Sequence, residues 1–130
     1  MQRRAALRLL SLAVSLLAGA ACLSPTLPLP PPEAPDVIRP STETPGVWVI
    51  SGDCTTGALV TVFNDRTRKG VVVEDTDQNG RYTVEIEAEL CDLMLVSQEV
   101  ATDEGFESSP TTSFVIEERD STGVIDNACP

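Results

Sequence analysis

The side chains with the clearest spacing for chemistry lie in the stretch DTDQNGRY, which begins at Asp75. Asp75, Asp77 and Asn79 alternate as the first ligands of a calcium-binding loop do, and a glycine follows where such a loop turns sharply. That loop also needs a bidentate glutamate six residues after the glycine, but this position is Ile86. A turn between two strands needs less, because Asn79-Gly80 tolerates positive φ and Asp77 could bond to its own backbone two residues on. The sequence therefore favours a turn.

The alternative is a weak calcium site built from loop carboxylates. It would join Asp75 and Asp77 to Asp103, which lies in the similar stretch TDEG. Carboxylate oxygens are the ligands that calcium prefers in proteins. Calcium is the one cofactor that this interpretation leaves open, and no other metal or cofactor is expected.

Few residues of the chain are suited to catalysis. The sequence holds no histidine, which removes Ser-His and Cys-His nucleophile pairs. The single lysine, Lys69, lies in a segment of turn residues that should face water. Glu85, Glu87 and Glu89 alternate outward along a predicted strand and past its end, where they face water rather than a closed site. We therefore predict that the protein is not an enzyme.

The N-terminus has the pattern of an export signal. Residues 1–21 begin with three arginines, continue through an apolar stretch and end in small residues, as secretory signal peptides do. The apolar stretch is shorter than the roughly 20 residues that a membrane-spanning helix needs. The last residues of the signal and the next one, LAGAAC, resemble the lipobox of bacterial lipoproteins, although Gly19 stands where that family usually has leucine.

The lipobox resemblance implies that Cys22 is acylated after the signal is cut, and that a lipid bilayer is a partner. Several buried acyl chains anchor a protein firmly. The other interpretation is an ordinary signal with an incidental cysteine after it. Leu23 is not the aspartate associated with inner-membrane retention in enteric bacteria, so we expect a lipid-anchored protein of the bacterial cell envelope, at the outer membrane.

The charge of the chain is strongly negative. Three of the nine basic residues and none of the 20 acidic residues precede Cys22, so removal of the signal would leave a net charge of −14. A field of this sign disfavours nucleic acid and anionic lipid, and favours solubility, cations or basic partners. The simpler interpretation, which the composition favours, is a solvated acidic surface without a specific partner.

Composition divides the exported part into three segments. Residues 22–45 hold eight of the ten prolines, which favours a disordered polyproline-type tether that could span about 60 Å. Residues 46–118 are short apolar runs cut by turn residues, typical of antiparallel strands. In YTVEIE, for example, Tyr82, Val84 and Ile86 share one face. We predict an all-β sandwich of six or seven strands, with residues 119–130 as an acidic flexible tail.

Three pieces of this region resemble bacterial immunoglobulin-like domains: ISGDCTTGALVTVFN, EDTDQNGRYTVEI and VATDEGFESSP. Carboxypeptidase regulatory-like domains share the first two pieces. Both families are β-sandwiches, so the resemblance implies a small antiparallel immunoglobulin-like sandwich. It also implies that calcium could bind at the loop ends, as it does in some sandwich domains of this kind.

With Cys22 acylated, Cys54, Cys91 and Cys129 would remain in an oxidising compartment. Three pairings are possible. We favour Cys54–Cys91, which lies within the predicted domain and would contribute about 3–4 kcal/mol by loop entropy. In a strict immunoglobulin order, however, these two cysteines could fall at opposite ends of the sandwich. A metal site is not expected, since C-x-x-C spacing and histidine are both lacking.

These observations predict a lipid-anchored envelope protein that displays one β-sandwich as a binding or adhesion module, with an unknown protein or cell-wall partner and no nucleic acid. The alternative is a non-catalytic structural subunit of an envelope assembly. A sugar-binding module would need an exposed aromatic platform. Trp48 is the single tryptophan and lies in an apolar run, so we expect it in the core.

Overall fold

The structure, a computed structural model, describes residues 27–126 and 129–130. Its regular elements are ten β-strands. Within this part of the chain there is no helix, and so no helix that could cross a membrane. The predicted signal peptide, residues 1–21, and the predicted acylation site, Cys22, lie outside the described residues.

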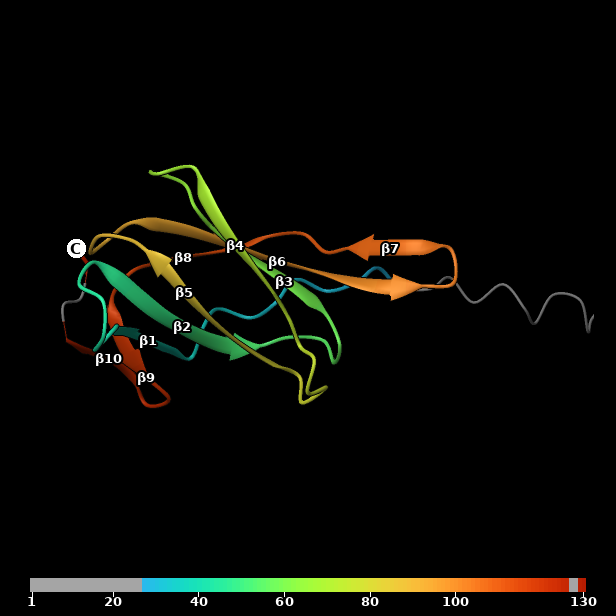
Figure 1. The fold of residues 1–130 in the computed structure, drawn as a ribbon, viewed down its shortest axis with the longest axis horizontal. Coiled ribbons are helices and arrows are strands. Elements are labelled where there is room, and N and C mark those ends of the chain that lie inside the picture. Colours follow the sequence, from blue (N-terminus) through green and yellow to red (C-terminus); the bar gives the residue numbers. More distant parts are fainter. Residues whose placement is uncertain (1–26, 127–128) are drawn as a thin grey trace, which may run out of the picture.

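Two antiparallel sheets form the molecule, and each has five strands (Figure 1). The first sheet has the order β10 (Gly123–Asp126), β9 (Glu118–Asp120), β1 (Val37–Pro40), β2 (Val47–Asp53) and β5 (Arg81–Glu87). The second has the order β4 (Lys69–Glu74), β3 (Leu59–Asn64), β6 (Leu93–Thr102) and β7 (Gly105–Ser108), and β8 (Thr112–Val115) pairs with the first half of β6. The prediction of an all-β antiparallel sandwich is confirmed, with more strands than expected.

The strands form where apolar and polar residues alternate. In β5, Tyr82, Val84 and Ile86 are buried, and the residues between them are exposed, as predicted from the period of two. Trp48 is also in the core, with 9% of its surface exposed. The other side chains of the packed core cluster come from both sheets, which shows that the sheets pack face to face; they are Ile38, Ile50, Ala58, Val60, Val62, Ala88, Met94, Val96, Phe114 and Ile116.

The proline-rich region is part of the domain. Leu29, Pro32, Pro35 and Ile38 are buried, and most of the residues between them are exposed. A three-residue period of burial matches polyproline II, which has three residues per turn. In its described part, from residue 27, the prediction of a disordered tether over residues 22–45 is therefore wrong. A proline-rich chain can be ordered when one of its three faces packs against a neighbouring surface.

The C-terminal region is also ordered up to Asp126. Residues 119–130, expected to be a flexible tail, contain most of β9 and all of β10, which extend the first sheet beyond β1. Ile38 of β1 pairs with Arg119 of β9. The domain boundaries at residues 46 and 118 are wrong for the same reason, because β1 and β9 pair with each other.

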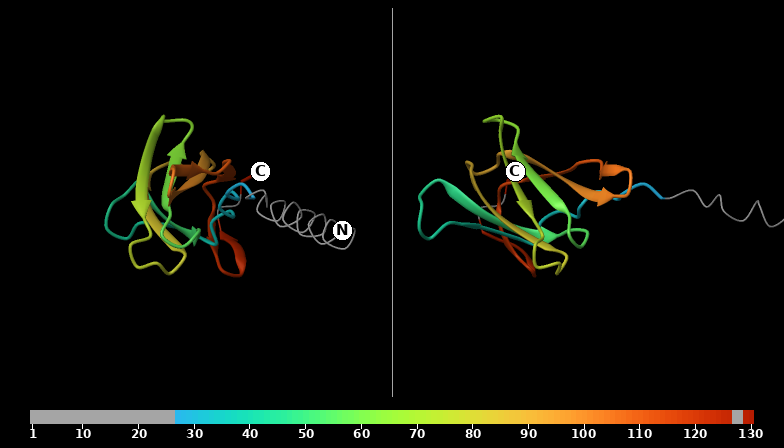
Figure 2. Two further views of the ribbon diagram at one scale, coloured as in Figure 1. Left: turned by 90° about the vertical axis from the view of Figure 1, so that its right-hand side faces the viewer. Right: turned by 45° about the vertical axis from the view of Figure 1, so that its right-hand side comes forward.

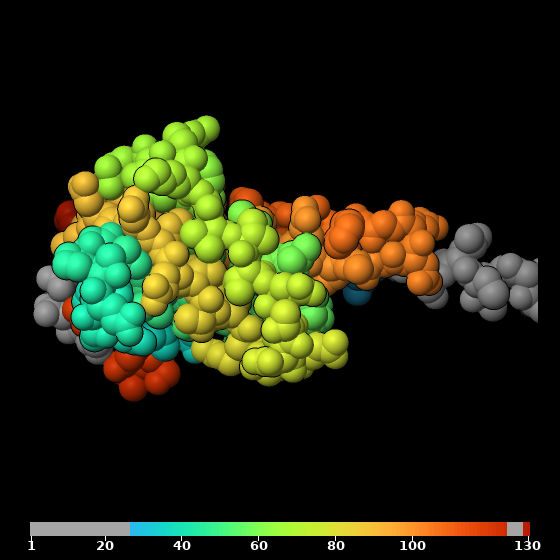
Figure 3. Space-filling view, in the orientation of Figure 1, coloured from blue at the N-terminus to red at the C-terminus, as the bar shows by residue number. Residues whose placement is uncertain are grey.

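One hairpin extends beyond the body of the sandwich. β7 pairs with the second half of β6, from Glu99 to Thr102, and this β6–β7 hairpin projects along the long axis of the molecule (Figures 1 and 3). The described chain also starts at this end, where its first (blue) segment runs beside the hairpin (Figure 2). The turn between β5 and β6 lies at the opposite end (Figure 1).

Candidate functional site

The DTDQNG stretch is a turn built around the Asp75 carboxylate. Asp75 is buried, with 4% of its surface exposed, between β4 and β5. Its Oδ2 accepts hydrogen bonds from the backbone N–H groups of Gly57 (3.0 Å) and Gly80 (2.9 Å), and its Oδ1 accepts one from Asn79 (3.1 Å). These bonds, the one from Gly57 first, hold the pKa of Asp75 below its usual range. The carboxylate therefore ties the β2–β3 loop to the β4–β5 turn.

The geometry of this turn differs from the prediction in two details. Positive φ occurs at Gln78 (53°) and Gly80 (74°) rather than at Asn79 and Gly80. The carboxylate that accepts hydrogen bonds from the turn backbone is that of Asp75, whereas the prediction named Asp77. The Oδ1 of Asn79 accepts a hydrogen bond from the backbone N–H of Arg81 at 2.9 Å, which leads the chain into β5. The prediction of a turn itself agrees with this geometry.

The three carboxylates of the calcium alternative are not gathered into a site. Both oxygens of Asp75 accept backbone N–H groups, Asp77 is exposed in the same turn, and Asp103 lies in the β6–β7 hairpin. In the part of the chain that the structure describes, no group of three or more His, Cys, Asp or Glu residues could hold a metal ion. The arrangement gives no support for calcium at these residues.

The disulfide joins Cys91 to Cys129, and the described Cys54 is free. The predicted Cys54–Cys91 bond is wrong because of strand direction. β2 and β5 are antiparallel, with Asp53 opposite Arg81 and Val47 opposite Glu87. Cys54 follows one end of this pair and Cys91 follows the other, so a strand length of roughly 20 Å lies between them. The two cysteines fall at opposite ends of the sandwich.

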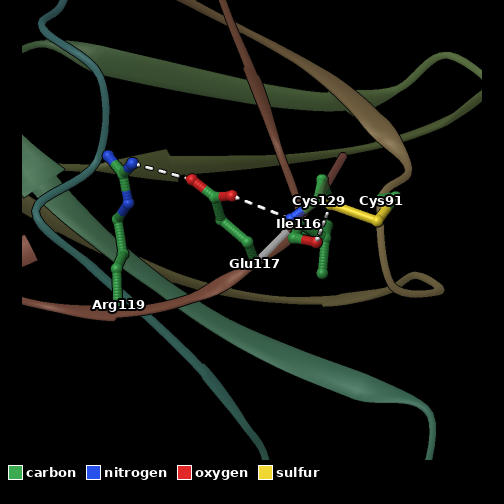
Figure 4. Close-up of a disulfide and its surroundings, with 5 residues drawn as sticks. All are labelled: Cys91, Ile116, Glu117, Arg119 and Cys129. Atoms are coloured by element: carbon green, nitrogen blue, oxygen red, sulfur yellow. Dashed lines mark hydrogen bonds and ion pairs between the residues drawn. A yellow bond between two sulfur atoms is a disulfide. The ribbon is translucent and has the colours of Figure 1, made fainter. Parts of the chain in front are cut away.

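The disulfide attaches the chain end to the core (Figure 4). The backbone N–H of Cys91 donates to the carbonyl of Ile116 at 2.7 Å, and the Sγ of Cys129 lies 3.5 Å from the same carbonyl. Glu117 accepts the backbone N–H of Cys129 at 3.3 Å, and a guanidinium hydrogen bond from Arg119 at 2.9 Å. The C-terminal end is thus held by covalent and polar contacts together.

A buried polar cluster lies near this end of the molecule. Asp92 is 6% exposed and accepts hydrogen bonds from the guanidinium of Arg66 (2.6 and 2.9 Å), the amide of Asn64 (2.9 Å) and the backbone N–H of Glu89 (2.9 Å). The Arg66 bond, helped by the others, lowers the pKa of Asp92 to about 2. Because each of these partners stabilises the charged carboxylate, the cluster suits a structural role rather than proton transfer.

Two other reactive groups near the core, the thiol of Cys54 and the hydroxyl of Tyr82, are held in their protonated forms. Burial, followed by the charges of Asp75 and Asp53, raises the pKa of the Cys54 thiol. Burial raises the pKa of Tyr82, whose hydroxyl is buried without a hydrogen-bond partner. A thiol with a raised pKa forms little thiolate at neutral pH and is a poor nucleophile.

The β6–β7 hairpin presents the most exposed aromatic side chain of the described surface. Phe106 is 68% exposed on β7. The sequence has no Lys or Arg between Arg81 and Arg119, and none of the described ion pairs includes an acidic residue of the hairpin; these residues are Glu99, Asp103, Glu104 and Glu107. An exposed aromatic ring among carboxylates is a candidate contact surface.

Two structurally important polar side chains, one glutamine and one asparagine, were not identified from the sequence. Gln98 occupies an inward position of β6 between Val96 and Val100, and Asn64 occupies an inward position of β3 after Val62. Both are buried, at 2% and 0% exposed. A polar residue in the apolar phase of a strand was the signal, since such a residue must find hydrogen bonds inside the protein.

Comparison with known proteins adds little to this description. No family model matches the chain, and no curated protein matches it. A solved structure described as "Myokine structure" is similar with a TM-score of 0.42 and 11% identity, and covers 69% of this chain and 98% of that chain. A similarity at this level does not define a shared fold.

Proposed function

We propose that the chain is an exported lipoprotein of the bacterial cell envelope, at the outer membrane, whose β-sandwich is a non-catalytic binding module. The observation that carries the proposal is the disulfide between Cys91 and Cys129. Disulfides persist in oxidising compartments outside the cytosol. An export signal that ends at Cys22, in a sequence resembling a lipobox, would deliver the chain to such a compartment.

The absence of an enzymatic role is supported by the chemistry of the described side chains. The pKa values of Asp75 and Asp92 are lowered by hydrogen bonds, which makes them poor general bases. The pKa of Cys54 is raised, which makes it a poor nucleophile. Lys69 pairs with Glu87 at 2.8 Å on the surface. These four groups therefore have protonation states or partners that oppose catalysis.

The charge of the domain indicates the chemistry of its partner. The 37 residues between Arg81 and Arg119 hold ten acidic and no basic residues. A surface of this sign accelerates association with basic partners and disfavours nucleic acid. We therefore propose a protein or cell-wall partner with a basic surface. The immunoglobulin-like resemblance is compatible with such a module and stays a prediction.

The test is membrane fractionation of bacteria that make the full chain. The Cys22→Ser variant should lose membrane association and remain unacylated, since acylation requires a thiol at this position. Cys54→Ser is the matched control and should stay in the membrane fraction. A Cys22→Ser protein that is still firmly bound to membranes would disprove the lipid anchor.

A structural accessory subunit of an envelope assembly is the second candidate. The same acidic surface that would attract a soluble ligand would also suit a permanent basic subunit. Purification of the wild-type protein from detergent-solubilised membranes distinguishes the two functions. A partner that remains at a fixed stoichiometry in high salt supports the accessory subunit, and release of all partners supports the binding module.

A further inference from the structure

The position of the N-terminal segment (residues 27–36) limits how far the domain can lie from a lipid anchor. This segment is attached to both sheets. The backbone N–H of Leu29 donates to Glu107 at 2.9 Å, the carbonyl of Pro30 accepts from the side chain of Gln98 at 2.8 Å, and that of Pro35 accepts from Arg119 at 3.3 Å. The hydroxyl of Thr112 also donates to the carbonyl of Pro32. The proline-rich region is therefore not free to act as a spacer from residue 29 on.

The remaining distance follows from covalent geometry. Leu29 lies seven positions after Cys22, and a fully extended chain over seven residue steps spans roughly 25 Å at most. A free tether up to residue 45 would have allowed about 60 Å. If Cys22 is acylated, as in the proposed function on which this inference rests, the sandwich must lie close to the bilayer.

The same contacts decide which end of the sandwich faces the bilayer. Leu29 is bonded to Glu107, the residue after Phe106 in the β6–β7 hairpin. The described chain starts beside this hairpin in two different views (Figures 1 and 2). Leu27 is 88% exposed and Phe106 is 68% exposed, so two large apolar side chains face solvent at the end where the anchor would attach.

We propose that the β6–β7 hairpin end contacts the headgroup region of the bilayer through Leu27 and Phe106. Exposed leucine and aromatic side chains are suited to the boundary between headgroups and acyl chains. The carboxylates of Asp103 and Glu104 beside them suit the ammonium groups of phosphatidylethanolamine, and oppose an anionic surface. The bilayer is therefore the occupant of this surface, and its lipids are zwitterionic.

The experiment places a tryptophan at each end of the full mature chain. Phe106→Trp marks the hairpin, and Leu90→Trp marks the β5–β6 turn at the opposite end, where Leu90 is 46% exposed. Each acylated variant is bound to vesicles of phosphatidylcholine and phosphatidylethanolamine that contain brominated phosphatidylcholine. Bromine should quench the Phe106→Trp variant strongly, and should quench Leu90→Trp no more than the wild type, whose Trp48 is buried.

Two further measurements test the same orientation. A flexible linker inserted between Leu23 and Ser24 lengthens the chain to the anchor without changing the domain, and should reduce quenching of the Phe106→Trp variant. Replacing phosphatidylethanolamine with anionic phosphatidylglycerol should reduce it as well. Equal quenching at both ends, or none at either end of a vesicle-bound protein, would overturn the proposed orientation.

Failure of the anchor is measured separately by vesicle flotation. If the protein made in bacteria carries no lipid and does not float, the lipoprotein proposal fails. The orientation is then tested by coupling Cys22 of the Cys54→Ser protein to a maleimide-bearing lipid, because Cys91 and Cys129 are joined. Quenching of the Phe106→Trp variant in this form supports the hairpin contact, and its absence refutes it.

Discussion

Gln98 and Pro30, 68 positions apart in the chain, are joined by a hydrogen bond of 2.8 Å from the side-chain amide to the proline carbonyl. The amide oxygen of the same side chain accepts the backbone N–H of Thr55 at 2.7 Å. One buried side chain therefore holds the N-terminal segment and the β2–β3 loop together. Gln98 lies on β6 between the residues that pair with β8 and those that pair with β7. On this edge of β6, Ser109 forms hydrogen bonds with the backbone of Gln98.

Gln98→Ala should release the N-terminal segment. The partly buried N–H of Thr55 would lose its acceptor, at a cost of about 1–3 kcal/mol in the free energy of unfolding. Hydrogen exchange should become faster at the amides of Thr55 and Leu29, while that of the central β2 amides should change little. Glu99→Gln, at the next and outward-facing position, is the control and should leave both amides unchanged. Unchanged exchange in Gln98→Ala would show that the segment is held by other contacts.

Cys129→Ser should lower the free energy of unfolding by about 4 kcal/mol, on the loop-entropy estimate for a separation of 38 residues. Urea unfolding under oxidising conditions measures this difference. Cys54→Ser should have a much smaller effect, since Cys54 is free. Adding a thiol reductant should destabilise the wild type in the same way. If Cys54→Ser were as destabilising as Cys129→Ser, or if this reductant had no effect on the wild type, the Cys91–Cys129 pairing would be contradicted.

Asp92 should make the protein sensitive to acid. Its pKa in the folded protein is about 2, below the ordinary value of 3.8, so folding favours the charged form. This contribution is fully present above pH 4 and is lost as the pH falls toward 2. Asp92→Asn should therefore be destabilised at neutral pH, and its difference from the wild type should shrink in urea titrations between pH 4 and pH 2. A difference that is constant with pH would show that the charge of Asp92 is unimportant.

Asp75→Ala should destabilise the fold much more than Asp77→Ala. The first change removes the acceptor of three backbone N–H groups, and the second removes an exposed side chain. Millimolar calcium should not raise the melting temperature of the wild-type domain. An occupied site at a hundred times its dissociation constant would stabilise by about 2.7 kcal/mol. A rise with calcium that disappears in both variants would establish a metal site.

Gly80→Ala should be more destabilising than Gly57→Ala. Both glycines have a φ of +74°, where a Cβ costs about 1–2 kcal/mol. A Cβ at Gly80 would also meet the carbonyl oxygen of Cys54 at 3.3 Å, whereas a Cβ at Gly57 meets nothing within 4 Å. Thermal unfolding of the two variants measures the added steric cost. Equal melting temperatures would mean that the turn relaxes away from the Cys54 carbonyl.

Local pattern was sufficient to predict the class of fold. The alternation of Tyr82, Val84 and Ile86 with polar residues requires a strand with one buried face, because successive side chains point to opposite sides. The Asp75 stretch was predicted as a turn for a similar reason, since the residues that a turn needs are contiguous in the chain. A calcium-binding loop was disfavoured on equally local grounds, because Ile86 lies at the position where such a loop has a glutamate.

The cysteine pairing required the tertiary structure. The spacing of Cys54, Cys91 and Cys129 permits three pairings, and the register of β2 against β5 makes the favoured one impossible. Strand register depends on contacts between residues far apart in the sequence. The pairing of Cys91 with Cys129 also depends on β9 and β10, which bring the chain back to the first sheet.

The proline-rich segment shows most clearly which properties follow from sequence and which depend on tertiary contacts. Its composition predicted an extended, polyproline-type backbone, and the buried positions from Leu29 to Ile38 follow the three-residue period of such a backbone. Composition could not decide whether the segment is a free tether or part of the domain. That depended on Gln98, Thr112 and Arg119, whose side chains reach its carbonyls only after two sheets have formed. The sequence determined the conformation of this segment, and tertiary contacts decided its place.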